Sequence, residues 1–489
     1  MQLRPYQEKA IADVREAFAS GVESVCLTAP CGAGKTVMFS RIAQLAVVRG
    51  VRVGILVHRD SLLTQASSKL REFGVQHGII SPGHGNYGDS INVCSVQTLV
   101  RRLERYKFDL LVADEGHHAT SPTYEKIFRN YPRAKVLGVT ATPERTDGRG
   151  LDSVYKKLVL GPSIEDLIRD GYLVQPITYG PIHKLDLSGI KTQMGDYDQR
   201  QLALHMDTPH ITADAITHYS QICPGVPAVV FCVNIKHAED VTAAFCAAGF
   251  RAALVHGKMD LTTIRARISG LSNGSVQVLV AVDLISEGTD IPAVVCAINL
   301  RATKSKGLHI QQGGRALRPI YAPGFDLSTR AGRLASIAAS SKPKAIILDH
   351  AANCLRHMTI DEPHEWALEG RKKRAGKGGG VAVPMRQCPK CQQVHRPAPK
   401  CPCFNPDGTP CGHVYTVDTE APEVQAGTLA PIDKVALRRA RWKEERACKS
   451  ISELTALGKK RKYANPSGWA YHRWQARGLA AKAGESFFQ

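Results

Sequence analysis

The chain has 489 residues, 43% of them hydrophobic, and a formal net charge of +20. This length predicts about three domains, and the hydrophobic content excludes a wholly disordered or collagen-like chain. The excess of Lys and Arg (64) over Asp and Glu (44) favours a polyanionic partner, either nucleic acid or an acidic membrane surface.

The expected compartment is the reducing cytoplasm. No stretch of the sequence has about 18 uninterrupted apolar residues, which argues against a membrane span. The first ten residues, MQLRPYQEKA, lack the apolar segment of a secretory signal. The 14 cysteines are therefore not expected to form disulfides, and the five between Cys388 and Cys411 need another explanation.

Two tandem units of alternating strands and helices are predicted before residue 360. Helices are expected in the first unit at 36–49, 60–73 and 98–105, and in the second at 235–248. Apolar runs that indicate buried parallel strands occur at 22–28, 51–57, 91–96, 109–114, 134–140, 227–233, 252–257, 276–282, 293–300 and 344–350. The fold class is therefore α/β, with two doubly wound parallel sheets in tandem.

A phosphate-binding loop is predicted at Ala29–Thr36 (APCGAGKT), which follows a strand and opens a helix. Small residues such as Gly32 and Gly34 let backbone N–H groups approach phosphates. Lys35 would reach the β- and γ-phosphates, and the Thr36 hydroxyl would hold Mg²⁺. Ala29 replaces the first glycine of the general pattern. A plain Gly-rich turn is the alternative, and the order of strand, loop, GKT and helix disfavours it.

The second half of an ATPase site is predicted where the strand at 109–114 ends. Asp114 would bind Mg²⁺ through water, and Glu115 would polarise the attacking water as a general base. The alternative is a simple pair of surface carboxylates. The GKT sequence at Gly34–Thr36, upstream in the same predicted sheet, makes this alternative less favoured. His117 and His118 follow, but adjacent histidines point in different directions, which argues against a metal site.

At this point the chain resembles a known family. The residues Asp114 to His117 (DEGH) resemble the DExH box of superfamily 2 helicases. Further segments resemble the other family motifs in the right order: Leu3–Gln7, Leu56–Gln65, Val93–Leu99, Val139–Arg145, Val278–Pro292 and Gln311–Pro319. The resemblance covers about residues 1–355. ATPERTDGRGL, LIRDGYLVQP and SEGTDIPAV are similar to the branch of XPB, UvsW and the restriction subunits, particularly its bacterial and prophage members.

The resemblance implies two RecA-like domains and an ATP-dependent helicase or translocase. It assigns Gln7 to the adenine edge. Gly288 and Asp290 would couple closure of the cleft to the nucleic-acid strand, and both are expected at the nucleotide site together with Gln311. Arg315 and Arg318, three residues apart, would reach the γ-phosphate from the second domain as arginine fingers. A solvated helix face is the alternative for these two arginines.

Three residues are candidates for contact with nucleic-acid phosphates: Arg59, Thr98 and, more weakly, Thr289. Each could equally be structural. DNA is favoured over RNA by the branch resemblance and by the cysteine cluster described next, although RNA stays open.

The cysteine cluster predicts a zinc ribbon. Cys388 and Cys391 form a C-x₂-C pair, and Cys401 with Cys411 is the favoured second pair. Cys403 could replace Cys401, and weaker alternative ligands are His395 and His413. Reduced cysteines in a loop are the alternative. Nothing nearby suggests an open catalytic position, so a structural Zn²⁺ is expected.

The last part of the chain is strongly basic. Residues 431–489 carry 14 Lys and Arg and 5 Asp and Glu, a net charge of +9, and include Trp442, Trp469 and Trp474. Basic side chains hold phosphates and aromatic faces stack on bases. A small helical bundle with the tryptophans in its core is the alternative.

The expected domain order follows from these assignments. It is an ATP-binding domain (1–165), a connecting segment (166–215), a helicase C-terminal domain (216–360), a basic Gly-rich linker (361–384), a zinc ribbon (385–417) and a basic, Trp-containing tail (418–489). Expected cofactors are ATP, Mg²⁺ and Zn²⁺. Expected partners are DNA and proteins of replication, recombination or restriction. An ATP-gated clamp and a restriction motor subunit are the alternative functions.

Overall fold

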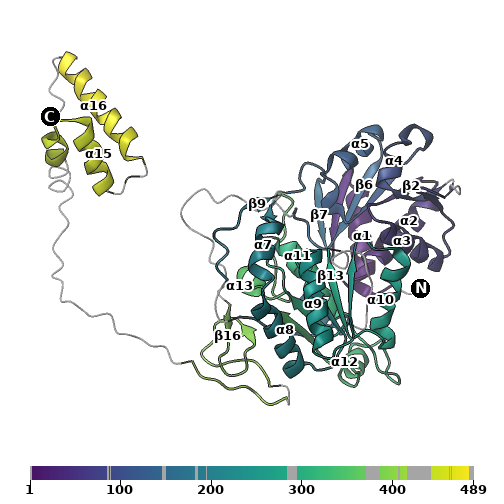
Figure 1. Cartoon of the computed structure of the whole chain (residues 1–489). Helices are drawn as coiled ribbons and strands as arrows, with labels where there is room; N and C mark the ends of the chain where they lie inside the picture. The colour runs from purple at the N-terminus through teal and green to yellow at the C-terminus, as the bar shows by residue number, and fades with distance from the viewer. Residues whose placement is uncertain are drawn as a thin grey trace. The chain divides into compact units, whose positions relative to one another are not determined.

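The computed structural model describes the residue ranges 3–84, 88, 90–145, 150–181, 185–193, 195–283, 294–369, 385–405, 408–415, 442–461, 463 and 465–483, without the side chains of 60, 61, 209 and 476–483. The chain forms two compact units, residues 1–415 and 416–489 (Figure 1).

The first domain is built on a seven-stranded parallel sheet. Its strands, in spatial order, are β3 (Gly78–Ile80), β4 (Ile91–Ser95), β2 (Val53–Val57), β5 (Leu110–Asp114), β6 (Lys135–Thr140), β1 (Ser24–Thr28) and β7 (Lys157–Leu160). The central strands are buried along their whole length because helices cover both faces, which is why they read as continuous apolar runs.

Alternate residues of β1 face the two helical layers of this domain. Val25 and Leu27 pack in the cluster that includes one set of helices, α1 (Pro5–Ala19), α2 (Lys35–Val47) and α3 (Asp60–Glu72). Cys26 packs in the opposite cluster, which draws on α4 (Val96–Leu99) and α5 (Pro122–Asn130). Turns of 3-10 helix occur at Leu103–Arg105 and Gly116–His118, and α6 spans Ile164–Arg169.

The second domain repeats this plan on a six-stranded parallel sheet. Its strands, in spatial order, are β12 (Ala252–His256), β13 (Val278–Val282), β11 (Ala228–Phe231), β14 (Cys296–Asn299), β15 (Ala345–Asp349) and β8 (Pro176–Tyr179). Its helices are α7 (Gln199–Met206), α8 (Pro209–Ile222), α9 (Ile235–Ala247), α10 (Leu261–Asn273), α11 (Lys306–Gly314), α12 (Arg330–Ala338) and α13 (Asn353–His357). A 3-10 turn, Arg315–Leu317, continues α11, and a small hairpin pairs β9 (Thr192–Gln193) with β10 (Asp196–Tyr197).

The cysteine-rich segment forms a small module attached to the second domain. Its strands β16 (Arg386–Gln387) and β17 (Val394–His395) pair with each other. Gln393 forms an antiparallel bridge with Tyr179 of the edge strand β8. Arg396 pairs with Glu362 of the second domain. The module therefore covers a sheet edge whose backbone groups would otherwise be open to other chains.

The second unit is helical. A helix at 442–447 precedes α15 (Ile451–Lys460) and α16 (Pro466–Ala483). Trp469 lies against the backbone of Gly458, where an added Cβ would be 3.1 Å from the indole. Its ring also meets Tyr463 edge-on, at 4.9 Å between centroids.

These observations confirm the predicted α/β class with two parallel-sheet domains, a cysteine module and C-terminal helices. Two local expectations differ from the structure. Residues 98–105 form the end of α4 and a separate 3-10 turn in place of one helix. The segment expected to connect the two domains contains β8, which belongs to the second sheet because it pairs with β15. No helix among the described residues is long and apolar enough to cross a membrane.

Candidate active site

The phosphate-binding loop joins β1 to α2 and needs its glycines for two reasons. Gly32 and Gly34 have φ angles of 85° and 80°, which side chains other than glycine rarely adopt. A Cβ on Gly34 would lie 2.5 Å from Nε2 of Gln7, and a Cβ on Gly32 would lie 2.9 Å from Leu173. The loop is therefore packed too tightly for larger residues, as a loop that brings backbone N–H groups to phosphates must be.

Gln7 supports this loop directly. Its Nε2 donates a hydrogen bond to the carbonyl of Ala33 at 3.0 Å, and its Oε1 accepts one from the backbone N–H of Arg4 at 3.0 Å. The hydroxyl of Tyr6 donates to the same Ala33 carbonyl. The amide expected to read adenine thus also holds the phosphate loop in place, which couples the base side of the cleft to its phosphate side.

The two acidic residues lie at the carboxyl end of β5, both more than nine-tenths buried. Glu115 has φ 50°, a left-handed conformation that costs about 1–3 kcal/mol for a non-glycine residue and clusters at functional sites. Its Oε2 is buried and has no hydrogen-bond partner among the described residues. Glu115 also lines a cleft together with Lys35 and Thr36, so the strained turn lies beside the phosphate-binding loop.

The electrostatics at Asp114 fit a divalent cation. Burial, together with the charge of Glu115, raises the pKa of the Asp114 carboxyl to about 7, and Lys35 acts in the opposite direction. A cation at this position would favour the ionised carboxylate and remove the cost of burying it. The Lys35 ammonium donates to the carbonyl of Ala29 at 3.4 Å, within the same loop. Asp114 and the Thr36 hydroxyl are the residues that would hold Mg²⁺.

Residues of both domains line one cleft of about 380 Å³. Lys35, Thr36, Asp114 and Glu115 come from the first domain, and Arg315 and Arg318 from the second. Arg315 is 4% exposed. The cleft also has lining residues that sequence reasoning did not assign: Arg4, Cys31, Gln65 and Lys69. Gln65 falls inside a segment that resembles a helicase motif, whereas Lys69, on the same face of α3 one turn later, carries no motif signal.

Gln311 lies elsewhere, in a neighbouring cavity of about 480 Å³ that it lines with His117, Thr142 and Arg301. His117 Nδ1 is 3.5 Å from Oε2 of Glu115 and 3.1 Å from Oγ1 of Thr140. His117 therefore connects the carboxylate of the cleft to the next strand.

The connection continues into the second domain. The Thr140 hydroxyl donates to the carbonyl of Thr142, and an added Cβ on Gly307 of α11 would lie 2.8 Å from Thr142. Beside this contact, Lys306 forms an ion pair with Glu144 at 3.3 Å. The cleft carboxylate is thus linked by contacts to the helix that precedes Arg315.

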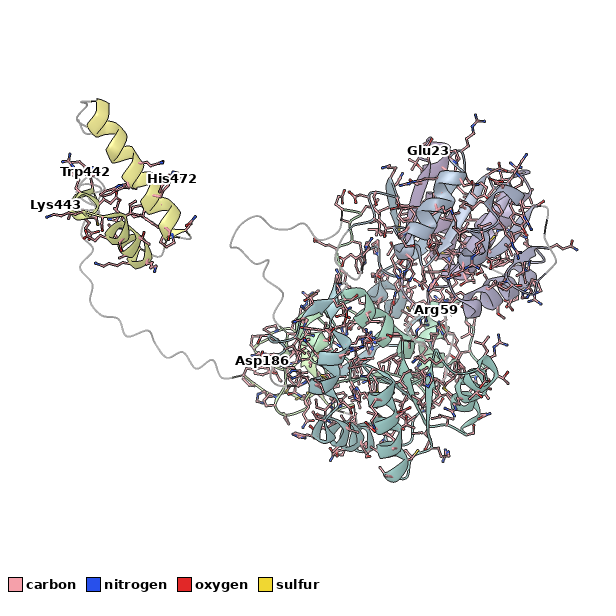
Figure 2. All side chains as sticks on the ribbon, turned by 45° about the horizontal axis from the view of Figure 1, so that its top comes forward. Glu23, Arg59, Asp186, Trp442, Lys443 and His472 are labelled. Carbon is pink, nitrogen blue, oxygen red and sulfur yellow. The ribbon has the colours of Figure 1, made fainter. Side chains whose placement is uncertain are left out.

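The candidate nucleic-acid residues lie in different settings. The Arg59 guanidinium donates to the carbonyl of Asp283 in the second domain at 3.2 Å, and Figure 2 labels this side chain where the two domains meet. Thr98 is only 7% exposed. Gly288, Thr289 and Asp290 lie outside the described residues. In this structure Arg59 bridges the domains, and Thr98 offers little surface to a ligand.

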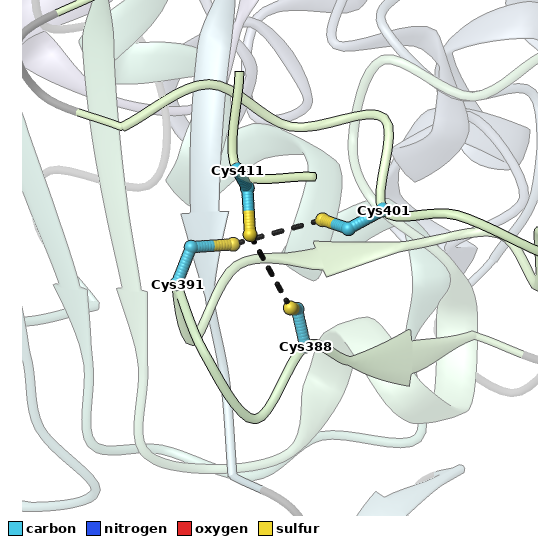
Figure 3. A group of neighbouring side chains, drawn as sticks. All are labelled: Cys388, Cys391, Cys401 and Cys411. Carbon is cyan, nitrogen blue, oxygen red and sulfur yellow. Dashed lines mark hydrogen bonds between the residues drawn. The ribbon is translucent and has the colours of Figure 1, made fainter. Parts of the chain in front are cut away.

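The four favoured cysteines converge, as Figure 3 shows. The Sγ atoms of Cys388 and Cys411 are 3.7 Å apart, as are those of Cys391 and Cys401. All four atoms lie within 4.8 Å of one another. Burial opposes ionisation of the Cys388 thiol, but backbone N–H groups of Cys391 and Lys390 stabilise its thiolate, and its pKa falls to about 6.

The alternative ligands form a second, smaller group. His395, Cys401 and Cys403 also lie within 4.8 Å of one another, whereas His413 belongs to neither group. Both ring nitrogens of His395 are already engaged, by the carbonyl of Arg396 and the hydroxyl of Tyr415. The set of four thiols is therefore the better metal site.

Family models match both domains. Residues 1–145 match the res subunit of type III restriction enzymes, and residues 214–319 match the helicase conserved C-terminal domain. A 51.5 kDa protein of a Lactococcus phage is 29% identical over 80% of this chain and 78% of its own length.

Two cellular proteins are similar over shorter parts. IRC3 of Saccharomyces cerevisiae, named as an ATP-dependent helicase, is 29% identical over 65% of this chain, which spans about half (49%) of that protein. The DNA 3'-5' translocase XPB2 of Sulfurisphaera tokodaii is 31% identical over 34% of this chain and 37% of its own length.

Among solved structures, a fragment described as an HsdR subunit of a type I restriction enzyme from Vibrio vulnificus superposes with a TM-score of 0.54. It is 18% identical, and the match covers 74% of this chain and 67% of that one. At this identity the likeness supports the fold alone. The two family models and the similar relatives identify the chain as a protein of helicase superfamily 2, in the branch that includes the restriction-enzyme subunits, with the ATP-hydrolysing activity of that family.

Proposed function

We propose that this chain is a DNA-stimulated ATPase that moves along or unwinds DNA by opening and closing the cleft between its two domains. The observation that carries the proposal is the shared cleft, in which Glu115 of one domain and Arg315 of the other line the same space. A nucleotide in that space would hold the domains together, and hydrolysis would release them.

Each cleft residue has a distinct task in this proposal. Backbone N–H groups of the loop and Lys35 bind the phosphates, while Thr36 and Asp114 hold Mg²⁺. Glu115 accepts the proton of the attacking water. Arg315 and Arg318 neutralise the charge that develops on the γ-phosphate. Mg²⁺ supplies charge neutralisation at the phosphate oxygens when it is bound.

The contacts that lead from Glu115 to the second domain would couple ATP hydrolysis to the binding of nucleic acid. His117 contacts both Glu115 and Thr140. The Thr140 hydroxyl donates to the carbonyl of Thr142, whose side chain packs against Gly307 of α11. We propose that nucleic acid bound across the domains changes this contact and so sets the orientation of the Glu115 carboxylate. ATP turnover would then depend on the presence of DNA.

DNA is the proposed track for two reasons. The net charge of +20 supplies general affinity for a polyanion. The similar XPB2 protein carries DNA translocase in its name. Stimulation of ATPase turnover by duplex DNA, single-stranded DNA and RNA, measured side by side with the Glu115→Gln variant as the inactive control, tests the proposal. Equal turnover with and without every nucleic acid would reject it and favour a chain that acts as a clamp.

A restriction motor is the second candidate, because residues 1–145 match the res subunit of a restriction enzyme. Such a motor would act with a nuclease or methyltransferase subunit, since the sequence shows no convincing nuclease cluster of its own. Co-purification of the chain with the products of neighbouring genes distinguishes this role from replication or recombination.

We also propose that Cys388, Cys391, Cys401 and Cys411 hold one structural Zn²⁺. Tetrahedral Zn²⁺ with Zn–S bonds of about 2.3 Å places sulfur atoms about 3.8 Å apart. This agrees with the two separations of 3.7 Å. The thiols must stay reduced for this purpose, which suits the cytoplasm.

A further inference from the structure

The basic C-terminal helices form a packed unit with a defined inner and outer side. Leu454 and Ala470 are fully buried between α15 and α16, and Trp469 covers Gly458. Trp469 is therefore half-buried against α15. By contrast, Tyr471 is 51% exposed and Trp474 is 37% exposed (Figure 2 labels their neighbour His472). Trp442, Tyr463 and Trp469 are thus half-buried in the unit, whereas Tyr471 and Trp474 are exposed.

Basic residues outnumber acidic residues in this unit, and the acidic residues have partners within it. Residues 442–483 contain ten Lys and Arg but only three acidic residues, a net charge of +7. Arg461 binds Glu444 and Glu445 at 2.8 and 2.6 Å, and Glu453 accepts the backbone N–H of Lys449 at 2.7 Å. All three acidic groups therefore have partners inside the unit. The unit therefore carries an excess of positive charge, which includes the exposed Lys443, Lys459 and Lys460.

One face of α16 combines these features. Ser467, Tyr471 and Trp474 are exposed and follow one another at i, i+4 and i+7, so they form a single stripe. Gln475 is exposed beside them and donates to the Tyr471 hydroxyl at 2.8 Å. Lys459 and Lys460, in the last turn of α15, are exposed next to the short connection that leads into α16.

We propose that this unit binds duplex DNA through residues 466–475 of α16, which enter the major groove while Lys459 and Lys460 contact the phosphates on its edge. A helix with its side chains is about 10–12 Å wide, which matches the major groove of about 12 Å. Hydroxyl, amide and aromatic side chains at Ser467, Tyr471, Trp474 and Gln475 suit base edges and thymine methyl groups. A helix preceded by a shorter, packed helix is a common way to enter this groove.

The shape of the face favours a duplex over a single strand. Proteins grip single strands in a basic groove that follows the backbone, with aromatic side chains along it. The exposed stripe of α16 lies on one convex helix, which fits into a groove and does not form one. This inference rests on the proposed role of DNA as the track, and it adds a second contact with DNA outside the two motor domains.

The experiment measures equilibrium binding of the full chain, without nucleotide, to a 30-base-pair duplex and to one of its single strands. The double variant Tyr471→Ala/Trp474→Ala should weaken duplex binding at least about tenfold and leave single-strand binding within about twofold. Both side chains are exposed, so the unit should stay folded, which circular dichroism checks.

A second variant separates phosphate contact from groove contact. Lys459→Ala/Lys460→Ala should lower the slope of log Kd against log salt for the duplex by about 1.8, since each phosphate contact contributes about 0.9. The matched control, Lys156→Ala/Lys157→Ala, removes two exposed lysines of the first domain and should leave the slope unchanged.

Equal losses on the duplex and the single strand would overturn the choice of duplex, and unchanged binding in both double variants would overturn the DNA contact itself. Either result leaves the motor intact if DNA still stimulates ATPase turnover in the Tyr471→Ala/Trp474→Ala variant. Absence of stimulation in the unaltered chain would instead reject the proposed function.

Discussion

The nucleotide cleft and the cysteine module bring their residues together over very different distances in the chain. Gln7 and Arg318, more than 300 positions apart in sequence, line one cleft, whereas the four thiols come from 24 consecutive residues. The cleft is held by two sheets with large apolar cores. The module has only a small cluster, in which the buried hydrophobic residues are the cysteines Cys388, Cys401 and Cys411.

The residues of the cleft and the cysteines of the module therefore differ in whether they contribute to folding as well as to the site. Cleft residues sit on a scaffold that packing already stabilises, so their loss should remove activity and leave the fold. The cysteines are both the site and the core of their module, so their loss should remove metal and fold together. Substitutions in the two regions test this difference.

Arg315→Ala should lower kcat of ATP hydrolysis by about 10³–10⁵ with little change in ATP affinity, because the guanidinium acts mainly in the transition state. Steady-state turnover and the binding of a fluorescent ATP analogue measure the two effects. Arg129→Ala, which alters an exposed arginine of α5, is the matched control. Normal turnover in a folded Arg315 variant would show that the second domain does not complete the site.

Glu115→Gln should lower turnover by about 10²–10⁴ and keep ATP binding, because the attacking water loses its base. The thermal midpoint should stay within a few degrees of that of the unaltered chain, since the amide retains the shape of the carboxylate. Glu125→Gln, at an exposed position of α5, serves as the control. A large loss of stability, without any loss of turnover per folded molecule, would contradict the assignment.

Cys388→Ser should reduce bound zinc from about one equivalent per chain to a small fraction, since a four-ligand structural site does not tolerate loss of a thiolate. Cys403→Ser should retain the metal. Atomic emission on purified protein measures both. Zinc loss in the Cys403 variant, with retention in Cys401→Ser, would make Cys403 the fourth ligand. Basal ATPase should persist in Cys388→Ser.

Gly180→Ala should have the smallest effect, a destabilisation of about 1–3 kcal/mol from overpacking. An added Cβ would lie 2.7 Å from Sγ of Cys354 and 3.1 Å from Val394 of the module, so it presses on the contact between module and sheet. Gly189→Ala is the control, because a Cβ there meets nothing within 4 Å. Thermal unfolding measures the difference, and zinc should remain bound. Equal stability of the two variants would mean that the module and the sheet can move slightly apart at Gly180 without a loss of stability.

Much of the fold followed from the sequence, because buried parallel strands appear as apolar runs and their order repeats in the two domains. The exceptions are strands that are not buried along their whole length. Strands β3, β7 and β8 alternate buried with partly exposed or exposed residues, whereas β11 and β14 are as short but fully buried. The pairing of β8 with β15 also joins segments that are far apart in the chain. Local hydrophobic periodicity does not encode contacts of this range.

For the candidate sites, the sequence by itself determined the residues whose chemistry depends on local geometry. Lys35 and Thr36 begin a helix after a Gly-rich loop, Asp114 and Glu115 end a strand, and the cysteines lie at ligand spacing. Each follows from backbone constraints within a few residues of the group itself.

Only the tertiary structure decided which distant groups meet. It places Lys69 in the cleft, joins Arg59 to the carbonyl of Asp283, and connects His117 to Thr140. It also leaves Trp442 and Trp469 half-buried and Trp474 exposed. The physical reason is common to all of these. Side-chain neighbours across domains and helices are set by packing between surfaces, and many sequences with the same local pattern could pack differently.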